Sequence, residues 1–245
     1  MVWTLVRRGL VVGVVAGLLA GAFAFVFGEP RVQDAIEIEE ASSAHASLAF
    51  SPPVGHISDW VVNRDEQRGG LFLATALYGI AVGGLSAVGF ALLRGRGAER
   101  TDWQLSTRLA AALFVAFALV PFIKYPPNPP AVGNPETIGD RTEYYLILLA
   151  GSLLALLAAA RVVWSIRDEA QPWVRPVLGA ATFTVLAGGL ALALPGVQEV
   201  PPDFPAPLIW EFRLSSLGTQ AVLWAVLGIG FGIASHRASG RPVRT

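Results

Sequence analysis

The sequence contains no cysteine, and its one methionine is Met1. The absence of cysteine excludes disulfide bonds, cysteine-ligated zinc, iron–sulfur clusters and a thiol nucleophile. Because methionine is confined to the first position, a thiolate or thioether site for Cu(I) is excluded as well.

Charge is also scarce. Charged residues make up 15% of the 245 residues, against about 25% in a typical soluble domain. Hydrophobic residues make up 53%, and the mean hydropathy is +0.55. The 18 basic and 18 acidic residues cancel, so a strongly basic nucleic-acid binder is excluded, and the apolar content is too high for a disordered chain. The composition predicts a polytopic membrane protein in contact with the lipid bilayer.

Six apolar segments are long enough to cross a membrane, which takes about 20 mostly apolar residues. None of them contains an acidic residue. The expected spans are residues 9–27, 69–93, 105–123, 144–163, 177–194 and 217–234. We therefore predict an all-α, polytopic integral membrane bundle of about six transmembrane helices, forming a single domain over residues 1–245.

The first segment has two interpretations. Arg7 and Arg8 precede an apolar core, and residues 22–24 resemble the cleavage site of a signal peptide. Glycine recurs every fourth residue along the same segment, a spacing that lets another helix approach closely and favours a retained span. These glycines are Gly9, Gly13, Gly17 and Gly21.

Basic residues orient the predicted bundle. Both termini and the second and fourth connections together hold 12 basic and four acidic residues, a net charge of +8. The other side holds six basic and 14 acidic residues, a net charge of −8. Because basic residues stay on the cytoplasmic side, we predict that both termini are cytoplasmic. The outer segments are then residues 28–68, 124–143 and 195–216.

The first outer segment carries the candidate metal ligands. Residues 32–41 read as a short helix with Pro30 near its first turn and carboxylates at spacings of three, and two of the chain's three histidines follow. Carboxylates with imidazoles suit a divalent metal of borderline hardness, such as Co²⁺ or Ni²⁺. An acidic helix that is merely solvated is the alternative. The candidate metal ligands are Asp34, Glu37, Glu40, His45 and His56.

The other two outer segments are rich in proline. Five prolines in the ten residues from Pro121 forbid a helix and favour an extended, stiff path. Such segments can form the outer mouth of a pathway or a rigid external cap that ties helix ends together. The residues assigned to this structural or gating loop are Lys124, Pro126, Pro127, Asn128, Pro129, Pro130, Arg141, Trp210 and Arg213.

If the proline-rich segments form a rigid external cap, Lys124, Arg141 and Arg213 would pair with nearby acids. The expected acids are Glu136, Asp140 and Glu211.

The spans lack a mid-membrane carboxylate or histidine, which proton-coupled carriers usually need. The sequence also lacks a GxxxxGK[ST] phosphate loop, an HExxH motif and a nucleophile–base pair. We therefore expect no enzyme and no permanently bound cofactor. Transport would draw on a gradient or on a partner.

Several segments resemble one family. The most specific reads KYPPNPPAVG at residues 124–133. The others lie within residues 28–40, 64–69, 134–142 and 204–220. Together they resemble CbtA, a family of predicted cobalt transporter subunits.

The resemblance implies a multi-pass protein of the cell membrane that imports cobalt for cobalamin synthesis. It also implies a small, single-span, histidine-bearing partner protein, CbtB. Two features depart from the family pattern: six spans rather than the five often described, and fewer histidines in the first outer segment than in many relatives.

The leading hypothesis is a membrane subunit of a Co²⁺ uptake transporter, with Co²⁺ as the transported ion and no nucleic-acid partner. The net charge of −8 on the outer side would raise the local concentration of cations. Two alternatives are a non-transporting membrane scaffold that assembles through its glycines and a carrier of another small solute. The carrier would use Lys124, Arg141 and Arg213 to bind an anion or an organic solute.

Overall fold

The computed structural model describes residues 2–49, 64–95, 101–166 and 170–239. These residues form helices and their connections, without a β-strand. Six helices among them are long and apolar enough to cross a membrane. This confirms the predicted all-α membrane class and its six spans. The orientation of the termini and the single membrane domain stay predictions.

The chain divides into two compact units, each described by itself. The first unit comprises residues 1–111, 128–131 and 205–245, and the second comprises residues 112–127 and 132–204.

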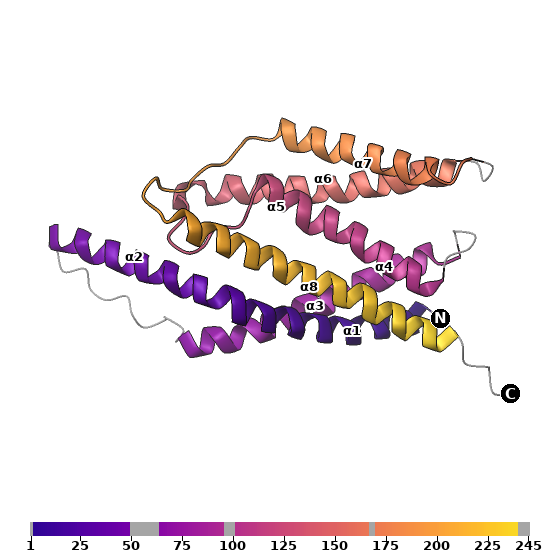
Figure 1. The fold of residues 1–245 in the computed structure, drawn as a ribbon, viewed down its shortest axis with the longest axis horizontal. Coiled ribbons are helices and arrows are strands. Elements are labelled where there is room, and N and C mark those ends of the chain that lie inside the picture. Colours follow the sequence, from indigo (N-terminus) through magenta and orange to yellow (C-terminus); the bar gives the residue numbers. More distant parts are fainter. Residues whose placement is uncertain (1, 50–63, 96–100, 167–169, 240–245) are drawn as a thin grey trace. The chain divides into compact units, whose positions relative to one another are not determined.

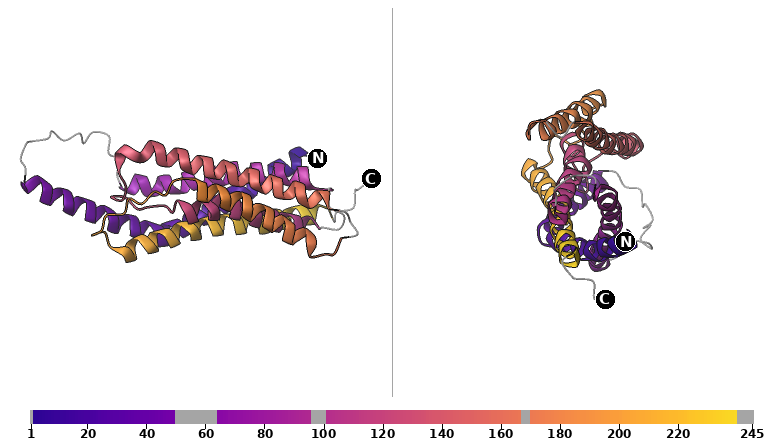
Figure 2. Two further views of the ribbon diagram at one scale, coloured as in Figure 1. Left: turned by 90° about the horizontal axis from the view of Figure 1, so that it is seen from above. Right: turned by 90° about the vertical axis from the view of Figure 1, so that its right-hand side faces the viewer.

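The helices of the first unit include a long N-terminal one. The helix α1 (Val2–Phe23) continues through the π-helix η1 (Ala24–Gly28) into α2 (Glu29–Ala49). The unit also holds α3 (Arg64–Leu93), most of α4 (Asp102–Leu113) and α8 (Ala206–Ser239). In two perpendicular views, α2 extends beyond the other helices of this unit (Figures 1 and 2).

The helices α1 and α3 pack antiparallel with their backbones in direct contact. A Cβ atom on Gly9 would collide with the carbonyl oxygen of Gly83, and one on Gly13 with that of Gly79. Gly17 is held in the same way by Thr75. The glycine spacing therefore serves close helix packing, as predicted. It also makes α1 an integral part of the first unit, as a retained span requires.

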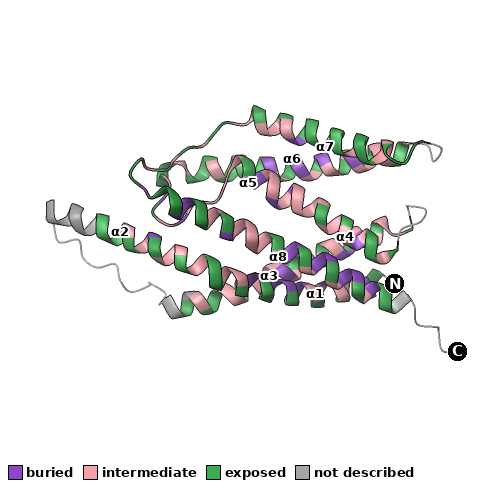
Figure 3. Cartoon of the chain, in the orientation of Figure 1, coloured by how far each residue is buried: buried purple, intermediate pink, exposed green. Residues whose placement is uncertain are grey.

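A second set of contacts closes the predicted cytoplasmic end of this unit. Phe90 of α3 and Phe231 of α8 meet edge to face, with 5.0 Å between ring centroids. Leu5 and Ala87 complete this buried cluster. Much of the helical surface is exposed (Figure 3). The exposed residues include many large apolar ones, and Leu85 is 73% exposed. Such exposure in a long apolar helix fits contact with lipid.

The second unit holds the π-helix η2 (Phe114–Leu119) and α5 (Val120–Lys124), followed by the 3₁₀-helix η3 (Pro135–Thr137). Its two long helices are α6 (Ile138–Ser165) and α7 (Val174–Ala193). A Cβ atom on Gly151 of α6 would collide with the side chain of Leu190 of α7.

Both π-helices precede a proline at the same distance. Pro30 lies two residues after η1, and Pro121 lies two residues after η2. Proline cannot donate to the carbonyl four residues back and collides with it, and a wider π-turn relieves that collision. The N–H of Glu29 accordingly bonds to Ala24, and that of Val120 to Val115, each five residues back.

These turns correct two expectations. Pro30 does not begin a separate short helix, because the helix is continuous from Val2 to Ala49. Pro121 does not end its helix, which continues to Lys124. In each case the π-turn absorbs the proline inside the helix.

In the second unit, a side chain replaces the N–H that Pro121 lacks. The π-turns of η2 leave the carbonyl of Ala116 to pair with residue 121, which has no N–H. The Ser152 hydroxyl of α6 donates to this carbonyl at 2.5 Å. Ser152 is fully buried, so its hydroxyl satisfies an acceptor that water cannot reach.

Candidate functional site

The predicted metal-binding carboxylates lie along α2. Asp34, Glu37 and Glu40 are exposed. Asp34 lies 3.7 Å from Arg31, and Glu37 accepts a 3.1 Å hydrogen bond from Gln33.

Helix geometry limits which of these ligands can share one ion. With a rise of about 1.5 Å per residue, residues three apart are neighbours, whereas Asp34 and His45 are about 16 Å apart along the axis. The side chain of His45 and the whole of His56 lie outside the described residues. In the described part of the chain, no group of three or more His, Asp or Glu side chains could hold a metal ion. The five-residue metal site therefore stays a prediction.

Two ion pairs fix the base of α2 within the first unit. Oε1 of Glu29 lies 3.2 Å from Nε of Arg68 on α3. Nε of Arg31 lies 2.7 Å from Oε2 of Glu211 on α8. On the same helix, Ala35 is completely buried. The acidic helix is therefore anchored at its N-terminal end, while Asp34, Glu37 and Glu40 are exposed.

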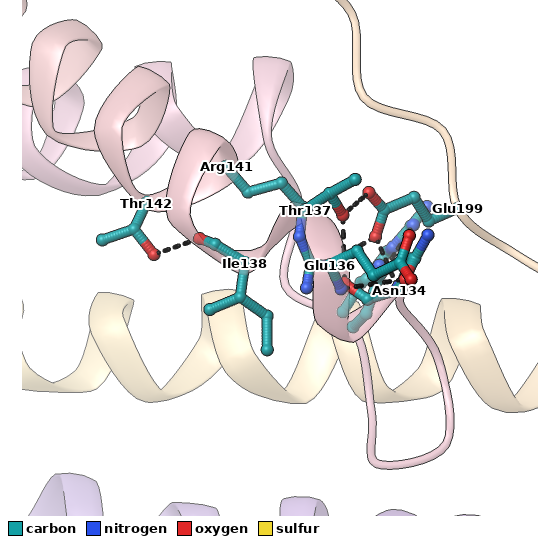
Figure 4. Close-up of polar contacts among 9 residues, drawn as sticks. Asn134, Glu136, Thr137, Ile138, Arg141, Thr142 and Glu199 are labelled. Carbon is teal, nitrogen blue, oxygen red and sulfur yellow. Dashed lines mark hydrogen bonds and ion pairs between the residues drawn. The ribbon is translucent and has the colours of Figure 1, made fainter.

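In the second unit, a polar cluster joins the two proline-rich segments (Figure 4). We call it the Glu199 clasp, formed by Asn134, Thr137, Arg141 and Glu199. Oε1 of Glu199 accepts a hydrogen bond from the Thr137 hydroxyl. Oε2 accepts the backbone N–H of Asn134 at 2.9 Å and lies 2.9 Å from Nη1 of Arg141.

The clasp stabilises the charged form of its carboxylate. The Thr137 hydrogen bond and then the Asn134 N–H lower the pKa of Glu199. Desolvation opposes them, and the charge of Arg141 lowers the pKa by a smaller amount. The backbone at Gly133 leaves room for the Arg141 guanidinium. Gly133 has a φ of +141°, and a Cβ atom there would lie 2.8 Å from Nη1 of Arg141.

Lys124 and Tyr125 close the same unit at the end of α7. The Lys124 ammonium donates to the carbonyl of Leu194 at 2.8 Å, and the Tyr125 hydroxyl donates to that of Pro195 at 2.8 Å. A cation at the C-terminus of a helix complements the helix dipole. Lys124 therefore caps α7.

The remaining residues of the predicted gating loop belong to the first unit, except Pro126 and Pro127 of the second. Residues 126–129 form neither helix nor strand, and their extended path stays a prediction. Pro129 is buried, Pro130 is half-buried, and Ala131 follows with a φ of +67°. Asn128 accepts a 2.8 Å hydrogen bond from Arg213.

Trp210 and Arg213 lie on α8 rather than in a loop, because that helix begins at Ala206. Trp210 is 58% exposed.

The expected acidic partners were wrong for Arg141. Arg141 pairs with Glu199 rather than with Glu136 or Asp140, because Asp140 is its immediate helical neighbour and points elsewhere. Glu211, another of the expected acids, pairs with Arg31.

The sequence reasoning also missed Asn134, Thr137 and Glu199. An Asn-Pro-Glu-Thr run at the start of a helix is a capping signal for the first two, and Asn134 does accept the N–H of Glu136 at 2.9 Å. No comparable signal marks Glu199.

A protein-family model matches nearly the whole chain. The model of the CbtA family, described as a probable cobalt transporter subunit, matches residues 2–236. The comparisons with curated proteins and with solved structures give no match.

Proposed function

Because the chain belongs to the CbtA family of probable cobalt transporter subunits, we propose that it is the membrane-spanning subunit through which cells take up Co²⁺. The family match over residues 2–236 carries this proposal. Six helices able to cross a membrane support it. The protein would reside in the cell membrane and have no enzymatic activity of its own.

The acidic helix α2 would concentrate the ion. It holds five acidic residues against one arginine, and its carboxylates raise the local concentration of cations. Screening limits their reach to about 10 Å at 0.1 M salt. Asp34, Glu37 and Glu40 would attract Co²⁺, and the imidazoles of His45 and His56 would bind it more specifically.

A partner would complete the transporter. The family description names a subunit, and we propose a small single-span protein that carries histidines. The chemistry supports this choice, because imidazole suits borderline divalent metals and this chain has only three histidines.

Cobalt accumulation tests the proposal. Cells that carry the chain with its partner should accumulate more Co²⁺ than cells with the partner alone. Equal accumulation would instead favour a membrane scaffold. Joint replacement of His45 and His56 by alanine should weaken uptake at low Co²⁺, and unchanged uptake would remove the role given to these histidines.

The contacts within each unit weigh against the two alternative functions. Gly9, Gly13 and Gly17 are occupied by α3 of the same chain, so this strip is closed to a partner helix. Lys124 and Arg141 are engaged with Leu194 and Glu199, which leaves them poorly placed to bind an anionic solute.

A further inference from the structure

One side chain near the middle of α8 carries an unsatisfied acceptor. Oε1 of Gln220 is buried, and it has no hydrogen-bond partner among the residues that the structure describes. Gln220 lies within both the expected span 217–234 and the longer candidate span Ala206–Arg237, nearer the predicted outer end of the apolar part. At that depth the bilayer offers no water as a substitute, and a buried acceptor without a donor costs about 1–3 kcal/mol.

The neighbouring hydroxyl groups do not share this condition. Ser215 and Ser216 donate to the carbonyl of Phe212 at 2.8 and 2.9 Å. Thr219 donates to the carbonyl of Ser215 at 2.8 Å. Each of these three hydroxyls is satisfied by its own helix, unlike the Gln220 oxygen.

The position of Gln220 on the helix directs it inward. Residues four and seven apart share a helical face, and Gln220 is therefore in one row with Trp224 and Leu227. Both of these are 4% exposed. One turn further along the row, Phe231 packs against Phe90 of α3. The row faces the interior of the first unit rather than lipid.

A small cavity lies further along the same row. Leu227 and Phe231 line it together with Ser86 and Phe90 of α3 and Ser106 of α4. All these residues belong to the first unit. The interior of this unit therefore holds the Gln220 oxygen and, closer to the predicted cytoplasmic end, a small cavity with a mostly apolar lining.

We propose that the Gln220 amide oxygen receives the transported divalent cation, with its bound waters, within the membrane-spanning part of α8. This inference rests on the proposed function and assigns a residue to the ion's path. A carbonyl oxygen accepts a cation or the protons of its bound waters but repels an anion. Because the amide carries no charge, it holds the ion weakly enough for release, as conduction requires.

The nearest basic residue on this row does not occupy the site. Arg213 lies seven residues away, about 10 Å along the helix axis, and donates to Asn128.

Cobalt uptake by two Gln220 variants tests the assignment. Gln220→Met keeps a similar size and removes the oxygen, and it should lower uptake at least tenfold at equal amounts of protein in the membrane. Gln220→Glu adds a charge, so it should lower both the half-saturating Co²⁺ concentration and the maximal rate, because the ion binds tighter and leaves more slowly. Thr219→Val is the matched control and should behave like the wild type.

Each outcome decides a separate claim. Wild-type uptake with unchanged kinetics in both Gln220 variants would overturn this inference and leave the proposed function intact. Absence of wild-type uptake would overturn the proposed function and this inference with it. If Gln220→Met fails to reach the membrane, Gln220→Glu decides, and an unchanged half-saturating concentration would overturn the assignment.

Discussion

At the scale of single residues, the best-defined polar contacts outside the spans meet at Glu199. One carboxylate receives a hydroxyl, a backbone N–H and a guanidinium. Charge-assisted hydrogen bonds of this kind are about twice as strong as neutral ones. The clasp joins residues more than 50 positions apart in sequence, so its effect on the second unit should show in stability before it shows in transport.

The clasp predicts a specific response to acid. Because the pKa of Glu199 is lowered in the folded protein, its contribution to stability is fully present above the ordinary value of 4.5. It is lost as the pH falls below 4.5 toward the lowered value. The unfolding temperature of the detergent-solubilised wild type should therefore fall as the pH drops through this window. In Glu199→Gln the unfolding temperature should depend less on pH over the same window.

Glu136→Gln provides the control, since Glu136 is an exposed carboxylate on the same segment. A Glu199→Gln profile that follows the wild type down to pH 3 would show that the clasp contributes nothing to stability.

At the scale of helices, the π-turns and the glycine contacts decide how the long helices fit together. Ser152 of α6 gives the Ala116 carbonyl the donor that Pro121 withholds. Ser152→Ala should lower the free energy of unfolding by about 1–3 kcal/mol, because it leaves a buried acceptor unpaired.

Pro121→Ala should reduce that loss, since residue 121 then supplies its own N–H. A double-mutant cycle measures the coupling between the two changes. Ser165→Ala, at an exposed serine of the same helix, should be nearly neutral. Strictly additive effects at residues 121 and 152 would contradict the replacement of the proline N–H by the serine hydroxyl.

The contact between α1 and α3 predicts an asymmetric response to added methyl groups. Gly13→Ala places a Cβ atom against the backbone of Gly79, so it should lower the free energy of unfolding by about 1–3 kcal/mol or prevent insertion. Gly189→Ala on α7 is the matched control, since nothing lies within 4 Å of its new Cβ atom in the described structure. It should be neutral or slightly stabilising. Equal thermal stability of the two variants would refute the close packing.

These helices also show what the sequence could predict. Long apolar runs and recurring glycines are local patterns, and the spans and the close helix packing that they predict are both present. The π-turns were not predicted, because a proline ends most helices and only its tertiary surroundings decide whether a helix continues through it. Glu199 was missed because its partners lie more than 50 residues away, and neither composition nor period links them. The metal-binding role of Asp34, Glu37, Glu40, His45 and His56 stays a prediction, as does the gating role of the proline-rich segments.

At the scale of the whole molecule, the main prediction concerns topology. The charge asymmetry predicts that both termini are cytoplasmic, and an even number of spans returns the chain to the side on which it began. Because the chain has no cysteine, one introduced cysteine is a unique probe. Glu40→Cys on α2 should react with a membrane-impermeant maleimide in intact cells, whereas His236→Cys should react only after permeabilisation. The reverse pattern would invert the assignment of outside and inside.

The unbroken helix from Val2 to Ala49 has a mechanical consequence. Its outer part, α2, has 21 residues and is therefore about 30 Å long, three times the distance over which salt at 0.1 M screens charge. Charges at its tip are therefore screened from charges at its base, yet the tip is joined to α1 by continuous helix. The ion pairs at Glu29 and Arg31 hold α2 near its N-terminal end. A ligand that displaced the C-terminal end of α2 sideways would therefore also tilt α1, because the two are one continuous helix.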